Sequence, residues 1–271
     1  MSDVTPAEPA APTLGNHPAS AWVRFLRSYG PTPSNTTLFD EYTVDALRKA
    51  NVSPIQLTSP LLTLILERAD SGRPGSILIA GTAGDGKTYH ARTLWTHLGG
   101  SAADWADKKS PIKELTLGDG RVAIFIKDLT ELSDHESDQA IGVLEESVLG
   151  REDRRFVVLV ANHGQILERL RECGRRQGRP HPLRAPIQEA FLQRAAAPER
   201  LALFDLSRQA RGESMQDVLR AVSEHPEWAK CTECAWHGNG RVCPIVENKG
   251  RMLGSTDQGR LRKRLTSLAE I

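Results

Sequence analysis

The stretch Gly81-Thr82-Ala83-Gly84-Asp85-Gly86-Lys87-Thr88 decides how the rest of this 271-residue chain is interpreted. It fits the pattern glycine, four residues, glycine, lysine, then serine or threonine. Glycines allow backbone conformations that a Cβ forbids, so successive N–H groups can turn inward around an anion. In such a loop Lys87 reaches the β- and γ-phosphates of a nucleotide, and the Thr88 hydroxyl ligates Mg²⁺. The eight residues therefore predict a nucleotide-phosphate site.

The flanks of the loop fit this prediction, because a phosphate loop must follow a buried strand and open a helix. Residues 76–80 form a short apolar run after the turn residues 72–75, as in a central parallel strand. Apolar residues then recur with helical spacing until Gly99-Gly100, at Ala91, Leu94, Trp95 and Leu98. The helix N-terminus would point its positive end at the phosphates. We expect the Asp85 carboxylate to point to solvent, since phosphates would repel it.

Composition places few limits on the class of protein. Apolar residues make up 39% and charged residues 25% of the chain, with a formal net charge of +1, which is ordinary for a globular domain with an appendage. Apolar runs are too short to span a membrane, and the N-terminus lacks the pattern of a secretion signal. Four cysteines do not make a disulfide framework. We therefore expect a cytoplasmic protein without a membrane partner.

Four segments are expected along the chain. Residues 1–20 are rich in Ala, Pro, Thr and Ser and predict a disordered tail. Residues 21–54 predict a helical segment, residues 55–210 the phosphate-loop domain, and residues 211–271 a helical and cysteine-bearing appendage. Within the domain, further strands are predicted at 112–117, 122–126, 156–161 and 201–206. The turn at 118–120 is short enough to make the first two of these an antiparallel hairpin.

Polar residues at the ends of two predicted strands are candidates for the chemistry of hydrolysis. Asp128 follows the strand 122–126 and is expected to hold Mg²⁺ through water, with a helix-capping acid as the alternative. Glu131 is a candidate to polarise the attacking water. Asn162 follows the strand 156–161 and could orient that water or contact the γ-phosphate, although asparagine is also common in turns.

Basic residues cluster in two places, which suggests contact with the phosphates of nucleic acid, although a solvated face is the ordinary interpretation. One cluster lies between residues 169 and 184, and the other comprises Arg260, Arg262, Lys263 and Arg264. Arg194 and Arg200 are candidates for an arginine finger that reaches the nucleotide of a neighbouring subunit.

A cysteine-rich segment near the C-terminus fits a structural Zn²⁺ site. Cys231 and Cys234 form a Cys-x-x-Cys pair, and His237 and Cys243 complete a tetrahedral set of three sulfurs and one imidazole. Free buried thiols and an iron–sulfur cluster are the alternatives, although a cluster normally uses a fourth cysteine.

The order of these motifs resembles the AAA+ and related P-loop ATPases over residues 55 to about 207. In that resemblance Asp128 matches the Walker B acid and Asn162 the sensor 1 asparagine. It implies an α/β fold with a mostly parallel central sheet in a three-layer αβα arrangement, with ATP and Mg²⁺ as cofactors and possible assembly into homo-oligomers. The acid expected directly after Asp128 is replaced by Leu129, which puts hydrolysis in doubt. The C-terminal segment is too short for the usual complete helical lid.

Four short stretches together look like the ATPase component of phosphorothioation-dependent DNA restriction systems. They are the residues 84–88, 126–132 and 161–164, and the Cys-x-x-Cys…Cys-Pro segment. This resemblance implies a role in bacterial antiphage defence with DNA-cleaving partner subunits. The sequence thus predicts an ATP-binding and ATP-hydrolysing protein that acts with partners on DNA. Two alternatives remain, a non-hydrolysing nucleotide switch with a zinc-stapled interaction surface and a small-molecule phosphotransferase.

Overall fold

The structure is a computed structural model that describes residues 18–27, 46–57, 59–107, 110–208, 211–233, 243–255 and 259–269. The chain divides into two compact units. One unit is the continuous segment Thr58–Ala210, and the other combines Met1–Leu57 with Arg211–Ile271. The two ends of the sequence, which the sequence analysis treats as separate segments, therefore share one unit.

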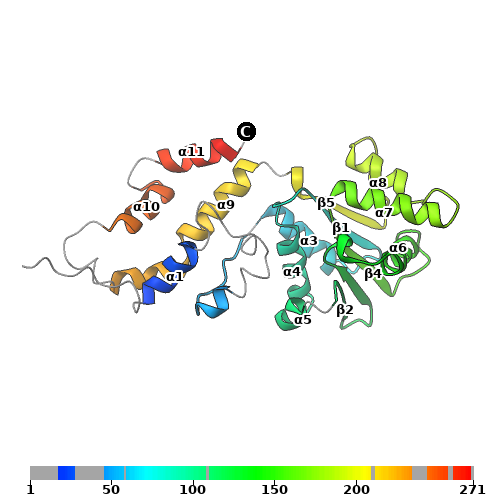
Figure 1. The fold of residues 1–271 in the computed structure, drawn as a ribbon, viewed down its shortest axis with the longest axis horizontal. Helices are drawn as coiled ribbons and strands as arrows, with labels where there is room; N and C mark the ends of the chain where they lie inside the picture. Colours follow the sequence, from blue (N-terminus) through cyan, green and yellow to red (C-terminus); the bar gives the residue numbers. More distant parts are fainter. Residues whose placement is uncertain are drawn as a thin grey trace, which may run out of the picture. The chain divides into compact units, whose positions relative to one another are not determined.

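The larger unit is an α/β fold built on one five-stranded sheet, as expected (Figure 1). The strands are β1 (Ser76–Ala80), β2 (Ile112–Thr116), β3 (Val122–Ile126), β4 (Arg155–Ala161) and β5 (Leu201–Asp205). Their order is β2-β3-β4-β1-β5, and only β2 runs antiparallel to its neighbour. The predicted hairpin of β2 and β3 and the mostly parallel sheet are both confirmed.

The interior strand β1, which lies between β4 and β5, is buried along its whole length, which explains its uniformly apolar sequence after Ser76. The one polar residue in it is satisfied inside the sheet. The Ser76 hydroxyl accepts a hydrogen bond from the Val157 N–H at 3.0 Å and lies 3.1 Å from the Ser147 hydroxyl. A buried hydroxyl without such partners would cost free energy on folding, so this short network lets a serine begin a core strand.

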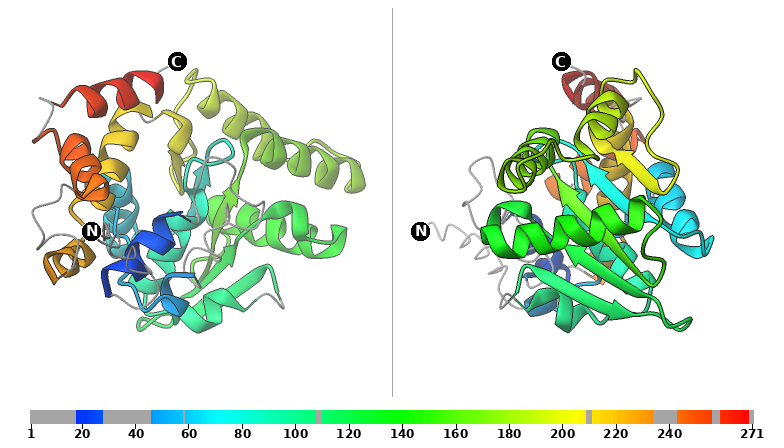
Figure 2. Two further views of the ribbon diagram at one scale, coloured as in Figure 1. Left: turned by 60° about the vertical axis from the view of Figure 1, so that its left-hand side comes forward. Right: turned by 90° about the vertical axis from the view of Figure 1, so that its right-hand side faces the viewer.

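Two apolar cores, one on each face of the sheet, hold the helices in place. Helices α3 (Pro60–Asp70), α4 (Lys87–His97) and α5 (Ala102–Ala106) cover one face, and α6 (Asp134–Val148), α7 (His163–Arg176) and α8 (Arg184–Phe191) cover the other. In the right-hand view of Figure 2, α6 lies in front of the strands. Burying apolar surface on both faces is the main stabilisation of such a sheet.

Polar caps fix where the helices begin. The Ser59 hydroxyl accepts from the Leu62 N–H at 3.0 Å at the start of α3, as the Ser-Pro sequence predicts. At the start of α6, Ser133 and Glu136 exchange hydrogen bonds in a capping box. Two short 3₁₀ helices, η2 (Leu129–Glu131) and η3 (Leu206–Arg208), directly follow β3 and β5. They keep the chain close to the ends of these two strands.

The second unit is helical in its described part. It contains α1 (Pro18–Arg27), α9 (Arg211–Ser223), the 3₁₀ helix η4 (Pro226–Glu233), α10 (Pro244–Leu253) and α11 (Arg260–Ala269). Trp22 of α1 is fully buried and stacks on His225 with ring centroids 4.2 Å apart. Helix α1 begins at Pro18, so the last three residues of the expected tail are helical.

Within the described segments, every helix is too short or too polar to cross a bilayer.

Candidate nucleotide-phosphate site

Parallel strands bring four chain segments to one edge of the sheet. Strands β1, β3, β4 and β5 run in the same direction, so the residues that follow them gather at their carboxyl ends. These residues are the loop 81–86 after β1, Asp128 after β3, Asn162 after β4 and Leu206 after β5. Ligands of open α/β sheets bind at this edge. The three sequence regions predicted to carry the chemistry therefore belong to one edge of the fold.

The loop has the backbone that its glycines suggested. Gly84 and Gly86 have φ angles of 86° and 79°, in the left-handed region that side-chain-bearing residues disfavour. Gly86 is the N-cap of α4, which begins at Lys87. In the described part of the chain, no protein acceptor takes the backbone N–H groups of Gly84, Gly86, Lys87 and Thr88. Four donors and a helix N-terminus thus face the same short loop, which is the composition of an anion site.

The expectation that Asp85 points to solvent is wrong. Its Oδ2 accepts hydrogen bonds from the Thr82 N–H at 2.5 Å and the Thr82 hydroxyl at 2.9 Å, so the carboxylate turns back onto the start of the loop. The N–H and hydroxyl of Thr82 give the Asp85 carboxylate two hydrogen bonds from one nearby residue, which stabilises this orientation over one that points to solvent. The bond restrains the first half of the loop and uses no N–H of Gly86, Lys87 or Thr88.

Lys87 and Asp128 belong to the same site. The Lys87 ammonium donates to the Thr82 carbonyl oxygen at 2.5 Å. Burial lowers the pKa of Lys87, and the negative charges of Asp85 and Asp128 oppose that lowering. A carboxylate acts in this way only over a short range. The charges of Lys87 and Asp128 therefore influence each other, although 41 positions separate the two residues in the sequence.

Asp128 also caps η2. Its Oδ1 accepts from the N–H and the hydroxyl of Thr130, each at 2.8 Å. The helix-capping alternative is thus present in the structure, and it engages one of the two carboxylate oxygens. Leu129, where a second acid was expected from the resemblance, is fully buried in the core. Glu131 is exposed, and no partner for it is recorded among the described residues.

Asn162 is the N-cap of helix α7 and directly follows β4. It forms a capping box with Gln165, in which the Asn162 N–H donates to Gln165 Oε1 at 3.0 Å and the Asn162 side chain faces the Gln165 N–H. Its Oδ1 is buried and has no well-formed hydrogen bond among the described residues. Buried amide oxygens are nearly always hydrogen-bonded, so this atom is an exception. Its role toward a γ-phosphate stays a prediction.

Sequence reasoning missed His90, which supports the loop from behind. This buried side chain lies on α4, with Nδ1 2.9 Å from the Gly86 carbonyl oxygen and Nε2 3.3 Å from the Ser59 hydroxyl. The carbonyl can only accept, so Nδ1 carries the proton and Nε2 accepts from Ser59. Burial lowers the pKa of His90, while the Gly86 carbonyl opposes it. The neutral imidazole therefore holds the backbone of Gly86, the last glycine of the loop, in place.

A second missed feature is Asp205, which pairs with His163. Asp205 ends β5, and its Oδ2 lies 2.9 Å from His163 Nε2 and 2.9 Å from Arg208 Nε. The rule that singled out Asp128, a carboxylate at the end of an apolar strand, also applies to Asp205. That rule would have found it.

The two basic clusters differ in the structure. In and after α7, four arginines pair with carboxylates: Arg169 with Asp134 and Glu172, Arg171 with Glu168, Arg176 with Asp138, and Arg179 with Glu145. The four cations of α11, at positions 260 and 262–264, are exposed and have no carboxylate partner among the described residues. In the first region Arg175 and Arg184 have no recorded carboxylate partner in the described chain, whereas in α11 this holds for all four cations.

The two candidate arginine fingers also differ. The Arg200 guanidinium is bound to the Ser147 carbonyl oxygen at 3.0 Å and to Asp153. Its own carbonyl accepts from Ser76, at the edge of the sheet opposite the phosphate loop. The Arg194 side chain is 67% exposed, with its nearest carboxylate, that of Glu189, 4.0 Å away. Arg194 is the one of the two that is open to solvent.

The predicted zinc site lies partly outside the described residues, because Cys234 and His237 are not among them. Cys231 and Cys243 are half-buried and not joined in a disulfide, and the described residues alone contain no group of three or more metal-ligating side chains. Cys173 is buried in the sheet core, where burial raises the pKa of its thiol to about 11. It is a core residue and does not take part in the predicted site.

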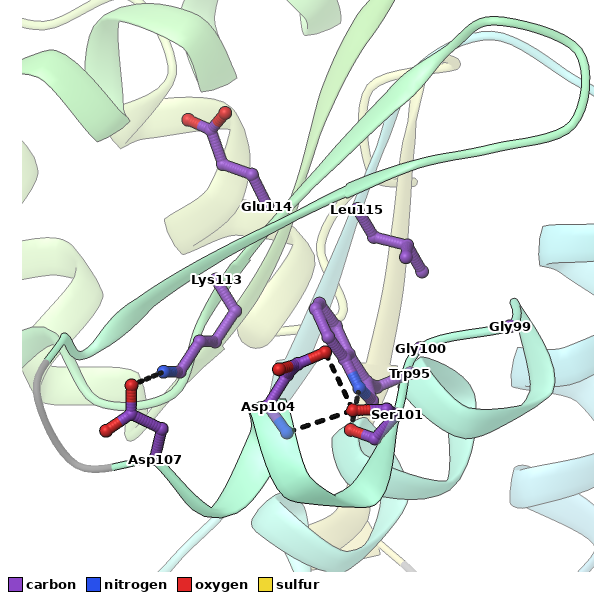
Figure 3. A pocket seen from close by; sticks show the side chains of 9 residues that line it. All are labelled: Trp95, Gly99, Gly100, Ser101, Asp104, Asp107, Lys113, Glu114 and Leu115. Atoms are coloured by element: carbon purple, nitrogen blue, oxygen red, sulfur yellow. Dashed lines mark hydrogen bonds and ion pairs between the residues drawn. The ribbon is translucent and has the colours of Figure 1, made fainter.

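A cavity of about 280 Å³ lies at the far end of α4 from the phosphate loop (Figure 3). Trp95 Nε1 donates to the Ser101 carbonyl oxygen at 2.8 Å in its wall, and the Lys113 ammonium lies 3.8 Å from Asp107. Asp104 also lines it and accepts from the Ser101 hydroxyl. These polar groups bond to one another in the cavity wall. The cavity is separate from the residues at the carboxyl ends of the strands.

Comparisons with protein-family models, with curated proteins and with solved structures found no match for this chain.

Proposed function

We propose that residues 81–88 bind the phosphates of a nucleoside triphosphate, with Mg²⁺, and that ATP is the nucleotide. The observation that carries the proposal is the loop itself. It combines two left-handed glycines, four backbone N–H groups without a protein acceptor in the described chain, and a lysine at the start of a helix. Each feature favours an anion, and together they suit a chain of phosphates. Lys87 would exchange the Thr82 carbonyl for phosphate oxygens, and the Thr88 hydroxyl would ligate the metal.

Hydrolysis is the second part of the proposal. Asp128 has one oxygen engaged in capping η2, and its other oxygen has no recorded protein donor in the described chain, so it can hold a metal-bound water. Asn162, whose buried Oδ1 has no recorded hydrogen bond within the described segments, could orient the attacking water. Glu131 is exposed next to Asp128 in sequence and is our candidate for activating that water.

A non-hydrolysing switch is the second candidate function. It is favoured by Leu129, because the position that should carry a catalytic acid is filled by a fully buried apolar side chain. In that case nucleotide binding alone would order the loop and its neighbours. Bound ATP that persists through purification, together with no phosphate release, would select the switch over the ATPase.

The nucleotide cycle would license action on DNA by partner proteins, in the manner of a restriction complex. Support comes from the surface of α11, which presents four cations in five consecutive positions, none with a carboxylate partner among the residues that the structure describes. Such a surface attracts a phosphate backbone without regard to base sequence. Affinity for duplex DNA measured at two salt concentrations tests this part, since phosphate contacts must weaken as salt rises.

Calorimetric titration of Mg-ATP tests the central proposal. Lys87→Ala should abolish measurable binding, because the ammonium is the only side-chain cation of the motif. Thr88→Ala should weaken binding in the presence of Mg²⁺ far more than in its absence, and Thr88→Ser, which keeps the hydroxyl, should behave like the wild type. Equal affinities for the wild type and Lys87→Ala would refute the proposed site.

A further inference from the structure

His163 and Asp205 are joined across the end of the strand that carries the phosphate loop. His163 is the first residue of α7, two positions after β4, and Asp205 is the last residue of β5. In the sheet, β1 lies between β4 and β5. The contact of 2.9 Å between His163 Nε2 and Asp205 Oδ2 must therefore pass over the end of β1, where Ala80 leads into Gly81.

Arg208 and Phe191 complete a closed chain of contacts, called the circuit below, around this pair. Arg208 Nε lies 2.9 Å from Asp205 Oδ2, and its Nη2 donates to the Phe191 carbonyl oxygen at 2.6 Å. The Phe191 ring in turn meets the His163 ring edge-on, with centroids 4.5 Å apart. The imidazole is thus fixed from two sides, by a carboxylate and by an aromatic edge, which leaves it little freedom to change rotamer.

The Asp205 carboxylate is buried, and both of its oxygens accept hydrogen bonds. Its side chain is 5% exposed, and Oδ1 accepts from the Ser207 hydroxyl at 2.7 Å and the Ser207 N–H at 3.1 Å. Burial would raise the pKa of Asp205, but the hydrogen bonds from Ser207 and His163 outweigh it and lower the pKa. The ionised carboxylate can only accept, so the Nε2 atom of His163 carries a proton and donates it to Asp205 Oδ2.

The circuit touches the candidate site on both sides. A Cβ placed on Gly81 would lie 3.3 Å from Leu206 Cβ, so the residue after Asp205 packs against the first residue of the phosphate loop. On the other side, His163 directly follows Asn162, whose Oδ1 is buried and unpaired in the described chain. Backbone pairing between β1 and β4 ends at Ala80 and Ala161, so beyond that point the sheet no longer holds Asn162 relative to the loop.

We propose that His163 and Asp205 form a positioning pair that holds the Asn162 side chain at a fixed place relative to the phosphate loop. The proposal rests on the proposed nucleotide site, and it adds the residues that set discrimination between a triphosphate and a diphosphate. Asn162 belongs at the γ-phosphate end of such a site, so its placement matters for ATP and hardly at all for ADP. Asp205 acts through His163 and does not itself touch the nucleotide.

The test compares the affinities of the wild type, His163→Ala and His163→Gln for a non-hydrolysable ATP analogue and for ADP, each with Mg²⁺. His163→Ala should lower the ratio of ATP-analogue to ADP affinity by about tenfold, the effect of one misplaced hydrogen bond to a charged group. His163→Gln keeps an N–H donor for Asp205 and should recover most of the ratio. An unchanged ratio in His163→Ala, or a ratio in His163→Gln as low as in His163→Ala, would overturn the proposal.

Two controls separate this proposal from the nucleotide site. Lys87→Ala should lose both nucleotides together, whereas His163→Ala should keep its affinity for ADP within about threefold, because only the γ-phosphate end is changed. The ¹⁵N spectrum of the wild-type imidazole, recorded without nucleotide, should show the proton of His163 on Nε2. Absence of all nucleotide binding by the wild type would refute the nucleotide site and the positioning role with it. An Nε2 atom without a proton would refute the pair alone, because Nε2 could then not donate to Asp205.

Discussion

A glycine-to-alanine series tests whether the loop conformation in the structure is the one that binds nucleotide. Gly84 and Gly86 have φ angles of 86° and 79°, and Gly72, before β1, is also in the left-handed region with φ 63°. A Cβ on Gly84 or Gly72 would meet nothing within 4 Å, and one on Gly86 would make an ordinary contact of 3.7 Å with His90 Nδ1. Alanine at these positions therefore adds backbone strain without a clash.

The expected magnitude follows from that strain. An alanine held in the left-handed region costs about 1–2 kcal/mol. At Gly72 the cost should appear as lower stability of the α/β unit, about 2–8 °C in Tm for a unit of this size. In the loop, an alanine can relax to a right-handed backbone conformation in the free protein. Phosphate binding would then require the left-handed conformation again, and its strain would lower the affinity. Affinity for Mg-ATP should fall by about 5- to 30-fold, because only the strained fraction is competent to bind.

The assay pairs calorimetric titration of Mg-ATP with thermal unfolding for Gly72→Ala, Gly84→Ala and Gly86→Ala. The strain in each loop variant should appear either as a lower Tm or as a lower affinity for Mg-ATP. The variant that loses less Tm should therefore lose more affinity. Gly72→Ala should keep wild-type affinity. If both loop variants bind as the wild type does and keep its Tm, the left-handed loop is not the binding conformation and the argument fails.

Four further predictions follow from the site and its surroundings. Asp128→Asn keeps an acceptor for Thr130 but loses the charge that holds Mg²⁺, so phosphate release should fall at least tenfold with Tm changed by no more than a few degrees. Asp85→Asn removes a negative charge beside the phosphates, and its affinity for Mg-ATP at low salt should rise severalfold, with the gain shrinking as salt is added. Burial lowers the pKa of both His90 and His181 below the value of 6.5 expected in the unfolded chain, so their contribution to stability is complete above pH about 6.5 and declines as pH falls further. Unfolding followed from pH 7.5 to 5 should show this decline, and a double His→Gln variant should show less of it. The purified protein should contain one zinc per chain by elemental analysis, and Cys231→Ser should reduce that content; a metal-free wild type would contradict the predicted zinc site.

The fold of the larger unit could be predicted largely from local patterns. Strand β1 matches its predicted bounds of Ser76 and Ala80, and the hairpin of β2 and β3 follows from a three-residue turn. These features depend on residues that are close in sequence, so periodicity and turn chemistry are sufficient to find them. The Ser59 cap of α3 belongs to the same class.

Interactions between distant residues could not be predicted in this way. The His163–Asp205 pair joins positions 42 apart, and it exists only because the strand order places β1 between β4 and β5. The burial of Trp22 against His225 depends on the two ends of the chain sharing one unit. Patterns of one strand or one helix contain no information on such pairings, although the carboxylate at the end of β5 could have marked Asp205 as a residue to examine.

The orientation of Asp85 affects how strongly the loop can attract phosphates. Repulsion between a carboxylate and a phosphate favours an Asp85 side chain that points to solvent. Thr82, however, offers two donors to Asp85 and its carbonyl oxygen to Lys87, and both interactions form. Lys87 thus has a partner before a phosphate arrives, so binding must exchange one interaction for another and the net gain is smaller than the bare attraction. Under the proposed function the charge of Asp85 adds to that exchange cost, so this loop should bind phosphates less tightly than a loop with a neutral residue at position 85.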